Sequence, residues 1–277
     1  MAHVLIAGAG YVGLALAEIL VAAGHRVTGL KRTPPVADHG LSWLAADVTR
    51  PETLAALPGD LDAVVCALAP SGRGEAAYRE IYLEGTGNLL AALPARSLPL
   101  LLVSSTGVYG QDDGQWVDED TPPAPTTPSG RILLEAEDRV LAARPDATIV
   151  RFSGIYGPGR TWLVDRVRSG QPVQVEPPSY TNRIHRDDCA RVLAWLLARR
   201  LAGHPLPPRL VASDDDPAPQ AEVMGWIADL LDCPAPPAAP RDPLAPRNKR
   251  CRNDRLKDLG YTFLFPSYRE GYEDMLD

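Results

Sequence analysis

The stretch HVLIAGAGYVGLALAEIL, residues 3–20, decides the fold of the first part of this chain. An apolar run ends at Gly8, Gly10 and Gly13, and a helical pattern of apolar residues follows without a gap. In this context Gly8 allows a tight turn, Gly10 lets the backbone approach a diphosphate, and Gly13 allows close packing of helix on strand. The free N–H groups of the first helical turn, where Tyr11 and Val12 lie, would face the phosphates. The stretch therefore predicts a dinucleotide-binding strand–turn–helix unit.

Short apolar runs continue to alternate with helical patterns up to residue 153. Strands are expected at 26–30, 41–47, 61–69, 98–105 and 147–153, and helices at 51–57, 75–93 and 126–141. Strands this apolar predict a parallel sheet that is covered on both faces, hence an α/β, doubly wound Rossmann domain. The repeated units favour a bound nucleotide over a glycine-rich turn without a ligand.

The regular pattern weakens after residue 153, which indicates a second, smaller lobe. We expect a Rossmann domain at 1–153 and a substrate lobe at 154–277, with one more Rossmann helix and strand returning at about 183–213. The proline-rich segment 233–247 is expected to be an extended connector. The basic segment 247–255, RNKRCRNDR, is expected to be a solvated lead-in to a helix.

Composition restricts the classes of partner. A net charge of -7 gives no electrostatic reason to expect nucleic acid or an anionic membrane. The four cysteines lack metal-ligand spacing, so no metal site is expected, and reduced thiols are typical of a cytoplasmic protein. Neither a membrane span nor a signal peptide is expected from the sequence, and we predict a cytoplasmic protein with a small-molecule substrate.

The end of the second predicted strand bears on the choice of dinucleotide. NAD-binding units usually carry an acidic residue there, which binds the ribose 2′-hydroxyl. This chain has Lys31 and Arg32 instead, two cations that suit a 2′-phosphate. The sequence thus favours NADP(H) over NAD(H). The competing explanation is that Lys31 and Arg32 are an ordinary solvated pair at a strand end, without a ligand.

Three further motifs, LLVSSTGVYG (101–110), RFSGIYGPGR (151–160) and NRIHRDDCARVL (182–193), carry a resemblance to a family. From residue 3 to about residue 200 the chain resembles the extended short-chain dehydrogenase/reductase superfamily, and its tail resembles that of atypical epimerase/dehydratase-like members. The resemblance implies further cofactor-binding residues at the ends of strands: Asp47, Val48, Ala67, Leu68, Ala69, Ser104 and Phe152. Asp47 matches the family residue that approaches the adenine.

The same resemblance implies an altered active site. In the family a Ser or Thr orients the reacting oxygen, an Asn lies on the preceding helix, and a Tyr-x-x-x-Lys supplies the acid/base. Ser105 matches the serine and Tyr82 takes the place of the asparagine. The Tyr and Lys positions fall on Ser129 and Leu133, and neither side chain can perform those roles because an alcohol is far less acidic than a phenol and leucine has no polar group.

Three interpretations follow from this alteration. Another group supplies the proton, with Tyr82 first, then Tyr109 and Tyr156, and with His185 as a residue that could titrate near neutrality. Alternatively water supplies the proton while Ser105 and Thr106 orient a carbonyl. In the third interpretation the protein binds NADP(H) without chemistry, as a redox sensor or scaffold. For each aromatic or imidazole group a packing role is the competing explanation.

Substrate and partner expectations also come from the resemblance. The family's substrate-contacting Asn falls on Gly154. Three arginines nearby could receive a phosphate or carboxylate, or could instead be structural surface arginines: Arg160, Arg183 and Arg186. Many relatives dimerise through a four-helix bundle, which here would use 75–82 and 132–140. The function expected is an NADP(H)-dependent oxidoreductase, or an epimerase/dehydratase-type enzyme, acting on a carbonyl, hydroxyl or sugar-like small molecule.

Overall fold

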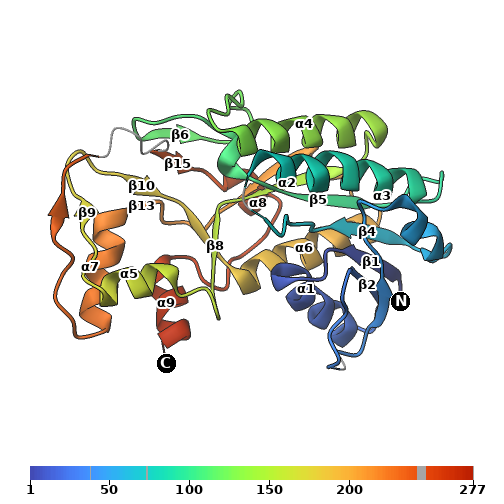
Figure 1. The fold of residues 1–277 in the computed structure, drawn as a ribbon, viewed down its shortest axis with the longest axis horizontal. Helices are drawn as coiled ribbons and strands as arrows, with labels where there is room; N and C mark the ends of the chain where they lie inside the picture. The colour runs from blue at the N-terminus through green and yellow to red at the C-terminus, as the bar shows by residue number, and fades with distance from the viewer. Residues whose placement is uncertain (38, 73, 242–247, 277) are drawn as a thin grey trace.

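The computed structural model describes residues 1–37, 39–72, 74–241 and 248–276. Within them a parallel seven-stranded sheet forms the centre of the main domain, in the order β12-β7-β5-β4-β1-β2-β3 (Figure 1). The strands are β1 (His3–Ala7), β2 (Arg26–Lys31), β3 (Ser42–Ala45), β4 (Ala63–Cys66), β5 (Leu100–Ser105), β7 (Thr148–Phe152) and β12 (Arg209–Ala212). The prediction of a doubly wound Rossmann sheet is confirmed.

Helices cover both faces of this sheet, as Figure 1 shows. Alternate residues of β1 explain why, since Val4 and Ile6 join one apolar cluster and Leu5 and Ala7 join the other. The first cluster is closed by α1 (Tyr11–Ala22) and α6 (Arg186–Leu201). On the opposite face lie the helices between residues 75 and 92 and α4 (Pro128–Ala143). Burial on two sides is what requires every residue of β1 to be apolar or partnered.

The helix expected at 75–93 forms, but it is not regular. It consists of α2 (Glu75–Arg79), a π-helical segment η2 (Glu80–Gly85) and α3 (Thr86–Ala92). The Thr86 hydroxyl donates a hydrogen bond to the carbonyl oxygen of Ile81, 3.4 Å away and five residues earlier. Such π segments are rare and often occur at functional sites. This one contains Tyr82.

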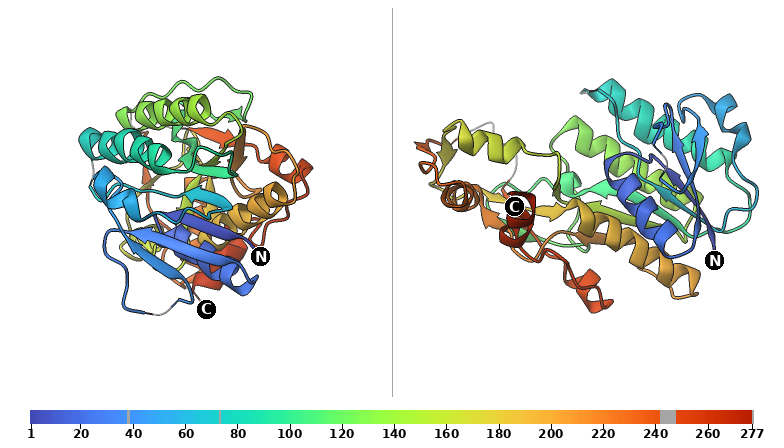
Figure 2. Two further views of the ribbon diagram at one scale, coloured as in Figure 1. Left: turned by 90° about the vertical axis from the view of Figure 1, so that its right-hand side faces the viewer. Right: turned by 90° about the horizontal axis from the view of Figure 1, so that it is seen from below.

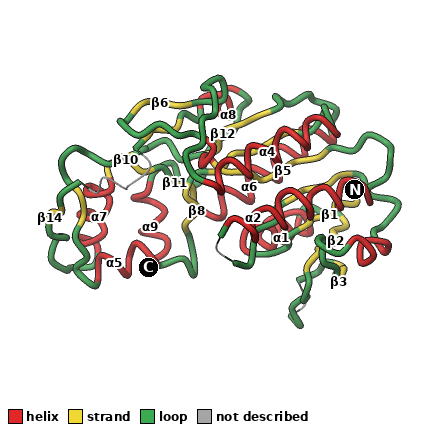
Figure 3. The backbone as a smooth tube through the Cα atoms, turned by 45° about the horizontal axis from the view of Figure 1, so that its top comes forward, coloured by secondary structure: helices red, strands yellow, loops and turns green. Residues whose placement is uncertain are grey.

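The second lobe packs at the carboxyl ends of the strands (Figures 2 and 3). It has its own cluster of buried apolar side chains. Its helices are α5 (Trp162–Arg168), α7 (Gln220–Leu230) and α9 (Tyr268–Leu276). The lobe also contains short two-stranded sheets: β8 (Gly154–Tyr156) with β11 (Arg183–His185), β10 (Tyr180–Thr181) with β13 (Ala218–Pro219), and β9 (Val173–Gln174) with β14 (Ala238–Ala239). The lobe therefore stands over the edge of the sheet where parallel-sheet proteins bind ligands.

Two local expectations need correction. The basic segment 247–255 is not a solvated lead-in throughout, because β15 (Lys249–Cys251) pairs in parallel with β6 (Gln115–Val117) before α8 (Asp254–Asp258) begins. Lys249 is buried and its Nζ donates to the carbonyl oxygen of Tyr109 at 3.2 Å. The helix expected at 51–57 is a 3-10 helix, η1 (Pro51–Ala56). Residues 242–247 of the predicted connector lie outside the described residues.

No helix in the described ranges combines the length and apolar character that a membrane crossing requires.

Candidate functional site

A cleft of about 440 Å³ runs along the carboxyl ends of β1, β2, β4, β5 and β7. Sixteen of its lining residues were expected from the sequence to be cofactor-binding or active-site positions. One of them, Leu133, stands where the family has its active-site lysine. The sixteen are Gly8, Gly10, Tyr11, Val12, Lys31, Arg32, Asp47, Val48, Ala67, Leu68, Ala69, Tyr82, Ser104, Ser105, Leu133 and Phe152. Segments that are far apart in the sequence thus meet at one edge of the sheet, because parallel strands place all their carboxyl ends together.

The glycine turn has the geometry that a diphosphate needs. Gly8 has φ +93°, and a Cβ on it would lie 2.4 Å from the carbonyl oxygen of Ala67. A Cβ on Gly13 would lie 2.4 Å from the oxygen of Gly8, so both positions exclude any side chain. Gly10 is open by contrast: apart from its chain neighbours, the nearest described atom to such a Cβ is the carbonyl oxygen of Gly8 at 4.0 Å. The backbone can therefore be approached closely at Gly10, directly before the free N–H groups of α1.

The first turn of α1 is left available to an anion. It has no side-chain cap and no acidic residue. Phosphates bind at helix N-termini because unpaired N–H groups and the helix dipole both favour negative charge. Gly13 itself does not line the cleft; it lies beneath the turn, where it allows the helix to pack closely on β1.

The adenosine end of the cleft carries charge of both signs. Lys31 and Arg32 are exposed at the end of β2, and Asp47 follows β3. One oxygen of Asp47 accepts hydrogen bonds from the backbone N–H of Thr49 at 3.0 Å and its hydroxyl at 2.8 Å. Burial alone would raise the pKa of Asp47, but these hydrogen bonds and the charges of Arg32 and Arg50 lower it. Asp47 is therefore an ionised acceptor beside two cations.

The opposite end of the cleft is lined by hydroxyls and apolar groups. Ser105 Oγ accepts a hydrogen bond from the N–H of Gly107 at 3.0 Å, so its own proton can be donated into the cleft. Ser104 differs, because its hydroxyl donates to Glu137 at 2.6 Å in the interior. Leu133, which is 7% exposed, forms part of the wall. No lysine, histidine or carboxylate lines this end among the described residues.

Tyr82 reaches this end from the π-helical segment. Its ring lies 5.5 Å from that of Tyr78, and no hydrogen bond to its hydroxyl is found within the described ranges. Burial raises the pKa of Tyr82 well above its usual value, and the neighbouring Tyr78 and Cys66 raise it further. With its pKa raised, the phenol stays protonated at neutral pH, and no cation among the described residues counters that rise. It can donate a proton but is a very weak base.

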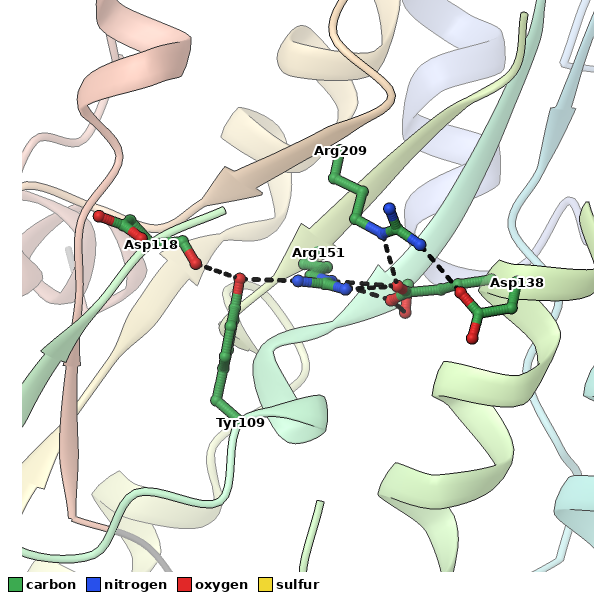
Figure 4. A network of polar contacts seen from close by, with 7 residues as sticks. Tyr109, Asp118, Asp138, Arg151 and Arg209 are labelled. Carbon is green, nitrogen blue, oxygen red and sulfur yellow. Dashed lines mark hydrogen bonds and ion pairs between the residues drawn. The ribbon is translucent and has the colours of Figure 1, made fainter. Parts of the chain in front are cut away.

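Tyr109 does not reach the cleft, although it was an alternative proton donor. Its hydroxyl donates to the carbonyl oxygen of Asp118 at 2.6 Å and accepts from Arg151 Nη1 at 2.8 Å (Figure 4). Arg151 is in turn paired with Glu137, and both side chains are almost fully buried. Burial raises the pKa of Tyr109 to about 12. The phenol therefore serves a structural network behind the sheet edge.

The other candidates also lie elsewhere. Thr106 is buried and does not line the cleft. His185 is fully buried, its Nδ1 accepts from the N–H of Asp187, and its ring lies 5.3 Å from the ring of Tyr156. Burial lowers the pKa of His185. The Ser129 hydroxyl lies 3.3 Å from that of Thr127, the N-cap of α4, and so belongs to the start of that helix.

The three arginines near the substrate lobe divide in the same way. Arg160 lines the cleft, whereas Arg183 is buried over the ring of Tyr268 and Arg186 is paired with Asp187 at 2.7 Å. The structure also adds lining residues that the sequence did not single out: Leu30, Thr33, Ala46, Ile81, Val103, Ser153 and Ile155. Ser153 directly follows β7, and its place at a strand end is the signal that could have found it.

The chain is similar to known proteins of one family. The model of the NAD-dependent epimerase/dehydratase family matches residues 4–206. A solved protein from Methylobacillus flagellatus, provisionally described as an NAD-dependent epimerase/dehydratase, is 39% identical, with coverage of 99% of this chain and 97% of its own and a TM-score of 0.81. Protein YeeZ of Escherichia coli strain K12 is 34% identical over 217 residues, 74% of this chain and 76% of YeeZ. The 3-diazoavenalumate denitrifying reductase of a Streptomyces species is 28% identical, covering 97% of this chain and 98% of the reductase.

Proposed function

The chain belongs to the NAD-dependent epimerase/dehydratase family, and we propose that it is an NADP(H)-dependent reductase of carbonyl groups on small polar, sugar-like molecules. The observation that carries this proposal is the composition of the cleft beyond the glycine turn. There the lining groups that can exchange a proton with a substrate are neutral hydroxyls, and Leu133 occupies the wall in the described part of the chain. This arrangement favours one direction of hydride transfer over the other.

The direction follows from acid–base chemistry. Hydride addition to a carbonyl creates an alkoxide, which is basic enough to take a proton from a neutral phenol or from water. Oxidation of an alcohol, the first step of an epimerase, requires a base that removes the hydroxyl proton. Since burial keeps Tyr82 protonated and no cation lies beside it among the residues lining the cleft, reduction is supported and oxidation is not.

The roles proposed for this chain's residues follow the geometry. The Ser105 hydroxyl would donate a hydrogen bond to the carbonyl oxygen and orient it, and Tyr82 would transfer the one proton that completes the reduction. Lys31 and Arg32 would hold the 2′-phosphate of the cofactor, and the ionised Asp47 would be the acceptor on the adenine side. The bound nicotinamide supplies the hydride, and the apolar wall at Leu133 limits access of water.

A second candidate is an NADP(H)-binding sensor without turnover. It is favoured by the same raised pKa, because a phenol without a neighbouring cation is a weak acid as well as a weak base. In this case cofactor binding would change the affinity of the protein for a partner molecule. The proposed partner surface is formed by α2 and α4, which would build a four-helix bundle with the same helices of a second copy of the chain.

The test is a screen of NADPH oxidation with aldehydes, ketones, keto sugars and nucleotide-linked keto sugars. We expect turnover with at least one class, and we expect Tyr82→Phe to lower kcat by about 10²-fold while cofactor affinity is kept. Tyr78→Phe changes the adjacent ring outside the cleft lining and is the matched comparison: it should lower kcat far less than Tyr82→Phe does. Absence of NADPH oxidation across the screen would favour the sensor, and epimerised product without net oxidation would favour an epimerase.

A further inference from the structure

The loop 157–160, which follows β8, crosses the first turn of α1. The hydroxyl of Tyr11 donates a hydrogen bond to the carbonyl oxygen of Pro158 at 2.9 Å. Tyr11 lies between Gly10 and Gly13, so the loop is fastened next to the glycine turn of the cleft. The loop is built for this contact: Gly157 has φ +137°, and a Cβ on it would lie 3.0 Å from the Tyr11 hydroxyl.

Arg160 is the last residue of this loop, and its guanidinium group lies over the ring of Tyr11. Its guanidinium carbon lies 4.1 Å from the centre of the Tyr11 ring, and the residue lines the cleft. One guanidinium nitrogen, Nη1, donates to the carbonyl oxygen of Ile155 at 3.1 Å. No carboxylate partner of Arg160 is found in the part of the chain that the structure describes. The guanidinium is therefore oriented and still has N–H groups for an anion.

Arg186 provides the contrast within the same cluster. Its guanidinium carbon lies 5.5 Å from the Tyr11 ring, but its Nε is bonded to Asp187 at 2.7 Å. That carboxylate offsets the charge of Arg186, and the residue does not line the cleft. Of the two arginines beside Tyr11, only Arg160 presents an uncompensated charge to the cleft among the described residues.

We infer that Arg160 is a diphosphate ligand, which binds the cofactor from the side of the second lobe and complements the N–H groups of α1. This inference rests on the proposed cofactor binding. The charge balance supports it. Lys31 and Arg32 lie at the adenosine end, so without Arg160 the negative diphosphate would meet the backbone N–H groups of α1 but no cation among the described lining residues. A guanidinium held on an aromatic ring loses little freedom on binding, so the contact is preorganised.

The experiment compares three ligands by calorimetry at fixed ionic strength: NADPH, ADP-ribose, which keeps the diphosphate but lacks nicotinamide and 2′-phosphate, and adenosine 2′-phosphate, which lacks the diphosphate. Arg160→Ala should weaken NADPH and ADP-ribose by about 10- to 100-fold, since a charge-assisted contact is lost. Affinity for adenosine 2′-phosphate should stay within about 3-fold. Arg166→Ala, which removes an arginine stacked 5.1 Å from Trp162 outside the cleft, should change none of the three affinities.

A second variant tests whether the position of the loop 157–160 is needed for diphosphate binding. Gly157→Ala should displace the loop from Tyr11 and weaken ADP-ribose without affecting adenosine 2′-phosphate. Unchanged affinity of Arg160→Ala for ADP-ribose, with normal binding by the parent protein, would overturn the inference and leave Arg160 to an anionic substrate group. A parent protein that binds neither NADPH nor ADP-ribose would instead refute the proposed cofactor binding itself.

Discussion

The proposed preference for NADP(H) can be tested at the adenosine end of the cleft with the double variant Lys31→Ala, Arg32→Ala. Both side chains are exposed and both line the cleft. In the proposed binding mode the diphosphate, ribose and nicotinamide would contact other residues, so the variant would remove positive charge where the 2′-phosphate would lie. Affinity for NADPH should fall much more than affinity for NADH.

The magnitude follows from the exposure of the two cations. Two unit charges 4 Å apart attract by about 1 kcal/mol in water and by about 4 kcal/mol at the effective dielectric constant of a protein surface. Exposure places each contact near the lower figure, and Asp47, whose pKa is lowered partly by Arg32, shares the charge of that arginine. We expect a combined loss of about 2–3 kcal/mol, which is roughly 30- to 150-fold in the dissociation constant.

The assay is calorimetry or quenching of protein fluorescence with NADPH and NADH at two salt concentrations. Salt should weaken NADPH binding by the parent protein more than by the variant, because screening acts on exposed charges. The preference should also fall below about pH 6, where a phosphate monoester takes up its second proton. Asp47 stays ionised there because its pKa is lowered, so it does not contribute to this change.

Arg50→Ala is the matched control, because Arg50 is an exposed cation near Asp47 that pairs with Glu52 at 3.0 Å and does not line the cleft. It should change neither affinity by more than about 2-fold. Equal weakening of NADPH and NADH by the double variant, or a preference that does not depend on salt, would refute the assignment of these cations to a 2′-phosphate.

Three further outcomes are expected. Glu137→Ala leaves the buried Arg151 without its carboxylate and should lower the free energy of unfolding by about 3–5 kcal/mol in urea titrations; a loss below about 1 kcal/mol would contradict the importance of this pair. Ser153→Ala removes a 5% exposed hydroxyl that has no partner in the described structure, so it should leave stability unchanged or slightly higher while weakening NADPH by about 3- to 10-fold; unchanged affinity would show that no ligand uses this hydroxyl. A hydrogen bond from Arg26 is the main cause that lowers the pKa of Asp60 to about 2. Asp60→Asn should therefore lower the free energy of unfolding above about pH 4, and progressively less as the pH falls toward 2. A difference in unfolding free energy between parent and variant that does not depend on pH would contradict this explanation.

The strand–turn–helix at residues 3–20 and the sheet around it could be predicted because their cause is local. In β1, Val4 and Leu5 face opposite sides of the sheet and both are fully buried. A continuous apolar run in the sequence predicts this burial on both sides. The glycine spacing likewise dictates the turn, since at Gly8 and Gly13 the backbone leaves no room for a side chain. The order of the βα units then fixes which strand ends meet.

The choice among candidate proton donors could not be made in this way. Tyr82 and Tyr109 are both tyrosines near family motifs, and the sequence does not state where either hydroxyl points. In the structure a π-helical segment carries Tyr82 to the cleft, while Arg151 and the carbonyl oxygen of Asp118 engage Tyr109. The partner Arg151 is 42 residues from Tyr109 in the chain, so only packing brings them together.

By itself, then, the sequence determined the Rossmann fold, the glycine turn and the cations at the end of β2, because each depends on neighbours within one βα unit. Tertiary structure alone decided that Arg160 lines the same cleft as Ser105 and that Lys249 is buried. These facts depend on which side of a strand end or loop a side chain leaves and on what packs against it from a distant segment. Such contacts form between residues whose spacing along the chain carries no periodic signal.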